Sequence, residues 1–99
     1  MSDAIGLTKD AAEFASRLSY KDIPEDALHI ARRCVLDGLA VMLAGSEQEA
    51  IDVAERYIRK TGGNPQSRVV GDAELAVPAH LAAFWNGLAG HIMDWDDTQ

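Results

Sequence analysis

The stretch Pro78-Ala-His-Leu-Ala-Ala-Phe-Trp-Asn-Gly-Leu-Ala-Gly-His-Ile-Met93 decides the fold of this chain. It is apolar on nearly every side, so a helix formed by it needs neighbours all round. Asn86 and His91 interrupt the apolar run, which therefore falls short of the ~20 residues of a membrane span. Gly87 and Gly90 lower helix propensity but let another helix or a ligand approach the backbone. We therefore expect a buried helix in a soluble protein, with no membrane partner.

The residues that follow, His91-Ile-Met-Asp94-Trp-Asp96-Asp97-Thr98-Gln99, gather three carboxylates where this helix emerges. Carboxylates at the mouth of an apolar pocket repel one another, and a low dielectric raises the pKa of at least one, which can then exchange a proton near neutral pH. Asp94 and Thr98 share one face if the helix continues, and His91, one turn before Asp94, can order its carboxylate. The pattern favours a proton-transfer site.

Other interpretations of this cluster stay open. Aspartate-rich clusters can hold Mg²⁺, but three Asp within four residues without a second cluster are weak evidence, so we expect no metal and no cofactor. A solvated acidic helix end is the plainest alternative, although carboxylates there oppose the helix dipole. A lone histidine on an apolar helix, such as His91, is more often a hydrogen-bonded core residue, and His29 and His80 have weaker claims still.

Three further helices are expected along the chain. The first starts at Thr8, whose hydroxyl caps it, and ends near Ser19; the second runs from Pro24 to Ala44; the third opens at Ser46 through a capping-box pattern with Glu49 and breaks at 61–65. The inward side chains are expected to be Leu7, Ala11, Phe14, Ala15 and Leu18 in the first helix, Leu28, Ala31, Val35, Leu39, Met42 and Leu43 in the second, and Ala50, Ala54, Tyr57 and Ile58 in the third. We predict an all-α helical bundle fragment with at most one short extended segment near 67–71.

Composition narrows the class of protein. The chain has 99 residues, and at this size roughly two thirds of the unfolded surface is buried at best, so partner surface is expected. With 9 Lys+Arg against 16 Asp+Glu the net charge is −7, and no basic stripe exists, so nucleic acid is not an expected partner. The single cysteine, Cys34, lies in an apolar helical run and is expected to be buried and reduced. Without a secretory signal at the N-terminus, we expect a cytoplasmic protein.

Taken together, these segments resemble the N-terminal part of the MmgE/PrpD family, which includes 2-methylcitrate dehydratase and cis-aconitate decarboxylase. The resemblance runs almost end to end and rests on the order and spacing of its pieces. The pieces are Leu18-Ser-Tyr20-Lys-Asp22-Ile-Pro24, Ala31-Arg-Arg-Cys-Val-Leu36-Asp37-Gly38-Leu-Ala with Leu43-Ala-Gly45-Ser46, Gly62-Gly63-Asn-Pro65 with Val69-Val-Gly71, and Ala82-Ala-Phe84-Trp-Asn86-Gly87 leading to His91-Ile-Met-Asp94-Trp-Asp96-Asp97-Thr98.

The resemblance implies a large helical domain joined to a smaller α+β lid domain, of which residues 1–99 are the N-terminal, truncated part, and a homodimer in full-length form. It implies metal-independent removal of a proton α to a carboxylate of a small di- or tricarboxylic acid, with loss of water, loss of CO₂ or epimerisation. A 2-methylcitrate dehydratase-like lyase of propionate metabolism is the expected form. Asp94 and Thr98 match family active-site positions, and Asp96 and Asp97 match the acidic motif around them, with His91 in a supporting place.

Electrostatics limits what the 99 residues do by themselves. A tricarboxylate beside three aspartates is repelled by roughly several kcal/mol at a low effective dielectric unless cations neutralise it. This chain offers no cation near the motif in sequence, and the histidines and lysines that the family uses lie further along. We expect residues 1–99 alone to be inactive.

Two alternatives for function come from other classes of protein. The five residues Asp94-Trp-Asp96-Asp97-Thr98 also resemble the acid motif of class II terpene cyclases, in which an Asp protonates an alkene. That resemblance covers far less of the chain. A non-catalytic helical module, whose exposed apolar faces bind a partner subunit, is the second alternative.

Overall fold

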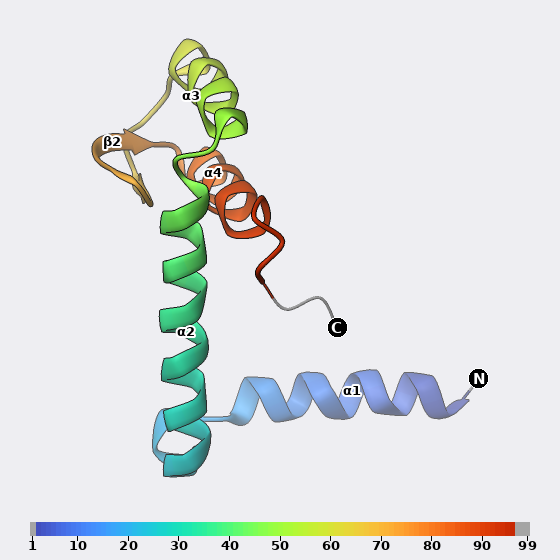
Figure 1. The fold of residues 1–99 in the computed structure, drawn as a ribbon. Helices are drawn as coiled ribbons and strands as arrows, with labels where there is room; N and C mark the ends of the chain where they lie inside the picture. Colours follow the sequence, from blue (N-terminus) through green and yellow to red (C-terminus); the bar gives the residue numbers. More distant parts are fainter. Residues whose placement is uncertain (1, 97–99) are drawn as a thin grey trace. The chain divides into compact units, whose positions relative to one another are not determined.

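The structure, a computed structural model, describes residues 2–96 and the side chains from residue 6 onward. It is predominantly helical, as predicted, with helices α1 to α4 and one short two-stranded sheet (Figure 1). The chain divides into two compact units, Met1–Arg32 and Arg33–Gln99, here called the N-terminal and C-terminal units. The boundary falls within the continuous helix α2.

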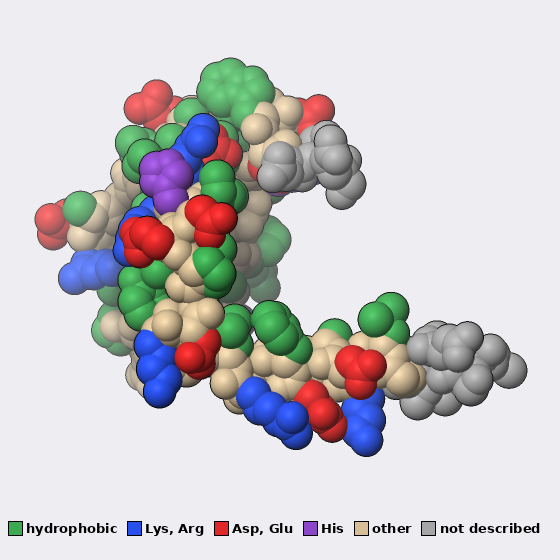
Figure 2. All heavy atoms as spheres, turned by 90° about the horizontal axis from the view of Figure 1, so that it is seen from below, with side chains coloured by type: hydrophobic (Ala, Val, Ile, Leu, Met, Phe, Trp, Pro, Cys, Tyr) green, Lys and Arg blue, Asp and Glu red, His purple; other side chains and the backbone are tan. Residues whose placement is uncertain are grey.

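The N-terminal unit is built from α1 (Ser2–Arg17), a 3-10 turn η1 (Tyr20–Asp22) and the first part of α2 (Glu25–Gly45). Helix α1 begins before Thr8, so the predicted Thr8 cap is wrong. The predicted inward face is also wrong for the described residues, because Leu7 is 72% exposed and Phe14 67% exposed. Figure 2 shows hydrophobic side chains along one side of α1 and charged ones along the other. The predicted periodicity is therefore present, but the apolar stripe is not buried.

Helix α2 differs from its prediction in what it buries. Its bounds agree with the expected 24–44 to within one residue, but only Val41 and Gly45 are buried. The side chains of Val35, Leu39 and Leu43 are at least half exposed, and the thiol of Cys34 is exposed too, so its predicted burial is wrong. A helix that is apolar on several sides needs more neighbours than the described residues supply.

Helix α3 (Glu49–Thr61) is the amphipathic outer helix that the sequence predicts. It buries Ile51, Ala54 and Ile58, whereas Ala50 and Tyr57, both expected inward, are exposed, Tyr57 to 62%. Gln48 precedes its first turn, not Ser46, whose hydroxyl donates back to the Leu43 carbonyl at 2.7 Å. The predicted capping box therefore does not form, because the Ser46 side chain helps to close the end of α2.

A β-hairpin follows α3, where the sequence predicts at most one extended segment. Strands β1 (Ser67–Val69) and β2 (Asp72–Val77) pair antiparallel, with an irregularity after Arg68. Gly71 turns the chain with a φ of +100°, which glycine adopts without strain. The Asp72 carboxylate accepts hydrogen bonds from the amides of residues 74 and 75, at 2.9 and 3.1 Å. These local bonds explain why a strand begins at a residue with low strand propensity.

The core lies between α3, the hairpin and α4 (Ala79–His91), all within the C-terminal unit. Trp85, 2% exposed, packs at its centre, and its indole N–H donates to the Val70 carbonyl at 3.0 Å. Next to it the Asn86 side chain accepts from the Val70 amide at 2.8 Å. The buried hydrophobic residues of this core are Ile51, Ile58, Val69, Leu75, Val77, Leu81, Ala82, Trp85 and Ala89. Two adjacent residues of α4 thus fix the hairpin turn to the helix.

Helix α4 approaches α2 closely at two glycines. A side chain at Gly45 would collide with the Ala89 carbonyl, and a Cβ at Gly90 would meet Met42 at 3.3 Å. The expectation that Gly90 admits a close neighbour is confirmed, but Gly87 has open space around it. The close approach of the last turn of α2 to α4 sets the place from which the acidic motif leaves the core.

Candidate functional site

The acidic motif does not continue α4 as a helix. The last helical residue is His91, and the Asp94 amide donates to the His91 carbonyl at 2.8 Å to form a tight turn. Asp94 has a φ of +55°, a left-handed backbone that Asp adopts more readily than most residues. The prediction that Asp94 and Thr98 share a helical face is therefore not supported, since α4 ends three residues earlier. Asp97 and Thr98 lie outside the described residues.

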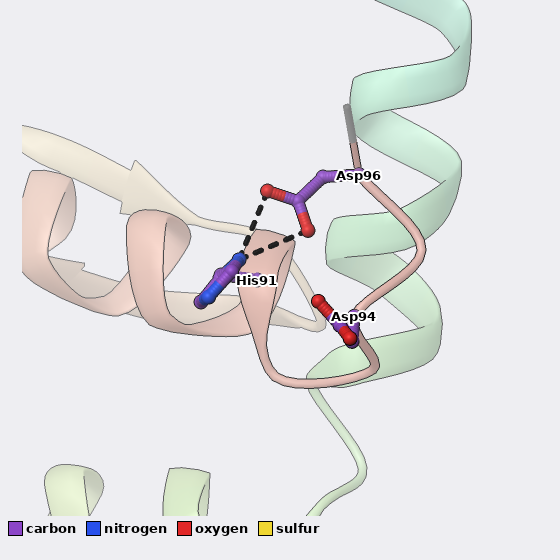
Figure 3. A group of neighbouring side chains, drawn as sticks. All are labelled: His91, Asp94 and Asp96. Atoms are coloured by element: carbon purple, nitrogen blue, oxygen red, sulfur yellow. Dashed lines mark hydrogen bonds and ion pairs between the residues drawn. The ribbon is translucent and has the colours of Figure 1, made fainter. Parts of the chain in front are cut away.

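His91 pairs with Asp96, not with Asp94 as the sequence suggests. Its Nδ1 atom lies 3.0 Å from each carboxylate oxygen of Asp96 (Figure 3). The two residues are five positions apart, on either side of the end of α4, and helical periodicity does not predict a contact at this spacing. His91 is not the core residue of the alternative interpretation either, because its side chain is 69% exposed. Sequence reasoning thus places His91 beside the acidic motif but gives its side chain the wrong partner.

The pair changes the protonation behaviour of both residues. The hydrogen bond to Asp96, with the attraction of its charge, raises the pKa of His91 above its ordinary value. The hydrogen bond from His91 lowers the pKa of Asp96. The expectation that a low dielectric raises the pKa of an aspartate here is wrong for Asp96, because the hydrogen bond from His91 lowers its pKa by more than desolvation raises it. When it is protonated, the His91 side chain places one positive charge beside the carboxylates of the motif.

Asp94 presents its carboxylate at the surface of the turn. The side chain is exposed and makes no hydrogen bond within residues 2–96, and it acts on His91 only through its charge, as the smallest of the causes that raise the His91 pKa. Figure 3 shows it on the turn between His91 and Asp96. A carboxylate in this state can accept a proton or repel an anion, so its chemistry depends on what else approaches it.

The three side chains also offer ligand atoms to a cation. One atom each from His91, Asp94 and Asp96 lie within 4.8 Å of one another. Exposed acidic groups are often this close without binding a metal, and His91 already directs Nδ1 at Asp96. We therefore assign no metal to this group.

Comparison with known proteins decides the family. The sequence model of the MmgE/PrpD N-terminal domain matches residues 9–99, which include the acidic motif. This chain belongs to the MmgE/PrpD family. It is 30% identical over 92 residues to the cis-aconitate decarboxylases of Homo sapiens and of Mus musculus. Each alignment covers 93% of this chain and 19% of the relative, so the chain spans about a fifth of the length of these curated relatives. No solved structure matches it.

Membership of the MmgE/PrpD family confirms the resemblance drawn from the sequence segments. The relatives named above are decarboxylases, which are lyases, and the predicted class of enzyme agrees with theirs at that level. The competing resemblance to class II terpene cyclases rests on five residues and gains no support from a match that spans 9–99. Within residues 2–96, no helix combines the length and the apolar character that a membrane crossing requires.

Proposed function

We propose that residues 1–99 form the N-terminal part of a metal-independent lyase that removes a proton α to a carboxylate of a small di- or tricarboxylic acid. The observation that carries this proposal is the MmgE/PrpD match, because it extends through the acidic motif. In such an enzyme the helical domain pairs as a homodimer in the cytoplasm. Cis-aconitate is the first substrate to test, because the curated relatives are named for it, and 2-methylcitrate is the second.

Asp94 is the residue proposed to exchange the proton. Its carboxylate stands free at the surface of the turn, while Asp96 is already engaged by His91. Positioned proton transfer of this kind contributes about 10² to 10⁴ in rate. Thr98, at a matching family position, is proposed to contact the substrate beside Asp94, and Asp97 to contribute to the local field.

Charge explains why other parts of a longer protein are needed for activity. An anionic substrate that approaches Asp94 and Asp96 is repelled unless cations surround it. His91, when protonated, supplies one positive charge and is shared with Asp96. The remaining cations are to be sought in the other four fifths of a protein as long as the relatives. The 99 residues alone are expected to show no turnover.

A second candidate function is favoured by exposed apolar side chains. Large hydrophobic residues with more than half of their surface exposed occur on each of the helices α1 to α4. They are Leu7, Phe14, Tyr20, Ile30, Val35, Leu36, Leu43, Val53, Tyr57, Phe84 and Trp95, of which Tyr20 and Trp95 lie just outside these helices. Exposed apolar side chains on the face of a helix can form an interaction site. On this alternative the chain is a non-catalytic module that binds a partner subunit.

Steady-state kinetics separates the two functions. The protein to assay carries residues 1–99 and extends to the length of the relatives, with cis-aconitate and 2-methylcitrate as substrates. The expected result is turnover that is insensitive to EDTA and that Asp94→Asn lowers by ~10² to 10⁴, because a carboxamide keeps the shape and loses the basicity. Asp52→Asn makes the same chemical change at an exposed position on α3 and is expected to leave the rate near that of the parent.

Two outcomes contradict the proposal. An Asp94→Asn protein with unimpaired turnover removes Asp94 from the mechanism, and a parent enzyme that requires added divalent metal removes the metal-independent assignment. A folded, full-length protein without activity on any tested acid, but with a stable partner complex, favours the interaction module.

A further inference from the structure

His91 holds both sides of the turn that carries Asp94. Its backbone carbonyl accepts the Asp94 amide at 2.8 Å, and its Nδ1 lies 3.0 Å from both carboxylate oxygens of Asp96. The two contacts come from the last residue of α4, which the core holds in place through Trp85 and Ala89. One residue thus connects the end of α4 to the backbone of Asp94 and to the side chain two residues beyond it.

We infer that His91 is the positioning residue of the acidic motif: by binding Asp96 it closes the 92–95 turn and fixes the direction in which the Asp94 carboxylate projects. This inference deepens the proposed function and rests on it for the role of Asp94. His91 acts through Asp96 and the backbone and does not itself exchange the substrate proton. Sequence alone favours a direct contact between His91 and Asp94, which the structure does not contain.

The backbone of Asp94 gives a reason why the turn has to be held. A non-glycine residue at a φ of +55° is uncommon, because the left-handed conformation brings Cβ close to the following carbonyl oxygen. Met93 and Trp95, on either side, are not fully buried and contribute no deep anchor. The His91–Asp96 pair is the interaction within the described residues that spans this position.

Hydrogen-bonding chemistry indicates which imidazole nitrogen of His91 carries the proton in this pair. An ionised carboxylate only accepts hydrogen bonds, so Nδ1 of His91 carries a proton and Nε2 is the nitrogen that titrates. The carboxylates that act on the imidazole are those of Asp96 and, more weakly, Asp94. The ionised carboxylate already makes this hydrogen bond charge-assisted, and protonation of Nε2 adds the attraction between opposite charges.

The pH range of the pair follows from the directions of the two shifts. The pKa of His91 is raised on folding, so its contribution is complete below its unfolded value of about 6.5 and fades as the pH rises through the raised value. The pKa of Asp96 is lowered, so its contribution is present above about 3.9 and is lost as the pH falls through the lowered value. The turn is therefore held most firmly between about pH 4 and 6.5.

An NMR titration of the 99-residue chain tests the geometry without any assay of activity. The imidazole signals of His91, distinguished from those of His29 and His80 by substitution, are followed against pH. The parent is expected to titrate above about 6.5, and Asp96→Asn to return His91 toward that value. Asp94→Asn is the matched control, since it removes one carboxylate from the same turn and is expected to lower the His91 pKa less. Equal His91 pKa values in the parent and in Asp96→Asn would overturn the inference.

Kinetics on the longer protein tests the consequence. His91→Asn places an amide N–H near the position of Nδ1 and keeps the hydrogen bond to Asp96, whereas His91→Leu removes it. His91→Leu is expected to lower kcat by about 10²-fold, the effect of a small misplacement of a reacting group, with KM changed little. His91→Asn is expected to recover most of that loss. Because the side chain is exposed, both variants should fold.

The outcomes separate this inference from the proposed function. If His91→Asn is as slow as His91→Leu, the imidazole itself moves a proton and the positioning role is wrong. If the parent has no activity on any tested acid, the proposed function fails, but the NMR titration still decides whether His91 and Asp96 hold the turn.

Discussion

Two amphipathic helices, α1 in the N-terminal unit and α3 in the C-terminal unit, are stabilised in different ways. Helix α3 buries Ile51 and Ile58 to 1% exposure against the hairpin and α4. Along α1, no side chain from residue 6 onward is buried. The same periodicity in sequence thus accompanies a core in one unit and an uncovered stripe in the other.

The difference shows what each helix depends on. Helix α1 has two i,i+4 ion pairs, Lys9–Glu13 at 3.8 Å and Glu13–Arg17 at 3.5 Å, on exposed side chains. Such pairs contribute about 0.3–0.5 kcal/mol each, and a helix of about 15 residues is marginal without tertiary packing. The C-terminal unit is instead stabilised by buried apolar surface and by two hydrogen bonds from α4 to Val70, here called the Val70 clamp. Trp85 donates to the Val70 carbonyl, and Asn86 accepts from the Val70 amide. We expect the C-terminal unit to unfold cooperatively and α1 to be the weaker element.

The largest effect is expected from the centre of the core. Trp85→Ala removes a side chain that is 2% exposed and leaves the Val70 carbonyl without its indole partner, so the free energy of unfolding should fall by about 3–5 kcal/mol. Trp95→Ala is the matched control at 62% exposure and should change it by less than about 0.5 kcal/mol. Urea denaturation followed by circular dichroism measures both. Equal losses for the two variants would mean that the core is not centred on Trp85.

Two glycines of α2 provide the next comparison. Gly45→Ala forces a Cβ against the Ala89 carbonyl and should destabilise the C-terminal unit by about 1–3 kcal/mol. A Cβ at Gly38 would meet no neighbouring part of the described chain within 4 Å, so Gly38→Ala should instead stabilise the helix by about 0.5–1 kcal/mol. Thermal melts of the two variants show directly whether each substitution raises or lowers the stability. A stable Gly45→Ala protein would show that α2 and α4 do not approach each other this closely.

Substitution of Asn86 tests the Val70 clamp, because its side chain accepts the hydrogen bond from the Val70 amide. Asn86→Leu leaves the partly buried Val70 amide without an acceptor, which should cost about 1–3 kcal/mol. Asn64→Ala alters an exposed amide outside the hairpin and should have an effect of less than about 0.5 kcal/mol. The hydrogen-exchange rate of the Val70 amide measures directly how well this hydrogen bond is formed. An unchanged Val70 exchange rate in Asn86→Leu would exclude the clamp.

The smallest effect is expected in the N-terminal unit. Glu13→Gln removes the acid shared by the two ion pairs of α1 and should destabilise this helix by less than about 1 kcal/mol in total, which lowers its helical content slightly. The unfolding midpoint of the C-terminal unit should not move. Residue-resolved NMR chemical shifts separate the two units. A shift in the C-terminal midpoint would contradict the separation between them.

How much of this fold can be predicted from sequence depends on the kind of signal. The bounds of α2, and the break after α3 at Gly62, follow from helix periodicity and from glycines at helix ends, which act locally. Strand β2 escapes prediction because its start is fixed by the Asp72 side chain, an interaction that no periodicity reveals. The exposure of Cys34 and of the apolar stripe of α1 could not be predicted. The periodicity of a sequence shows which face of a helix is apolar, but not whether another element covers that face.

The candidate site follows the same rule. The residue types and their cluster at the end of α4 are evident in the sequence, but periodicity favours a continuing helix that does not form. The left-handed backbone at Asp94 and the i,i+5 pair between His91 and Asp96 depend on a turn that sequence spacing does not specify. Asp97 and Thr98 remain predictions.

Residue-resolved hydrogen exchange tests the contrast between the two units most directly. In native conditions, the amides of Ile58, Trp85 and Ala89 should exchange slowly and at similar rates, through cooperative opening of the C-terminal unit. Amides along α1 should exchange within about tenfold of the rates of an unfolded peptide, as expected for a marginal helix. If the α1 amides are protected as strongly as those of α4, the account of a single core in the C-terminal unit is wrong.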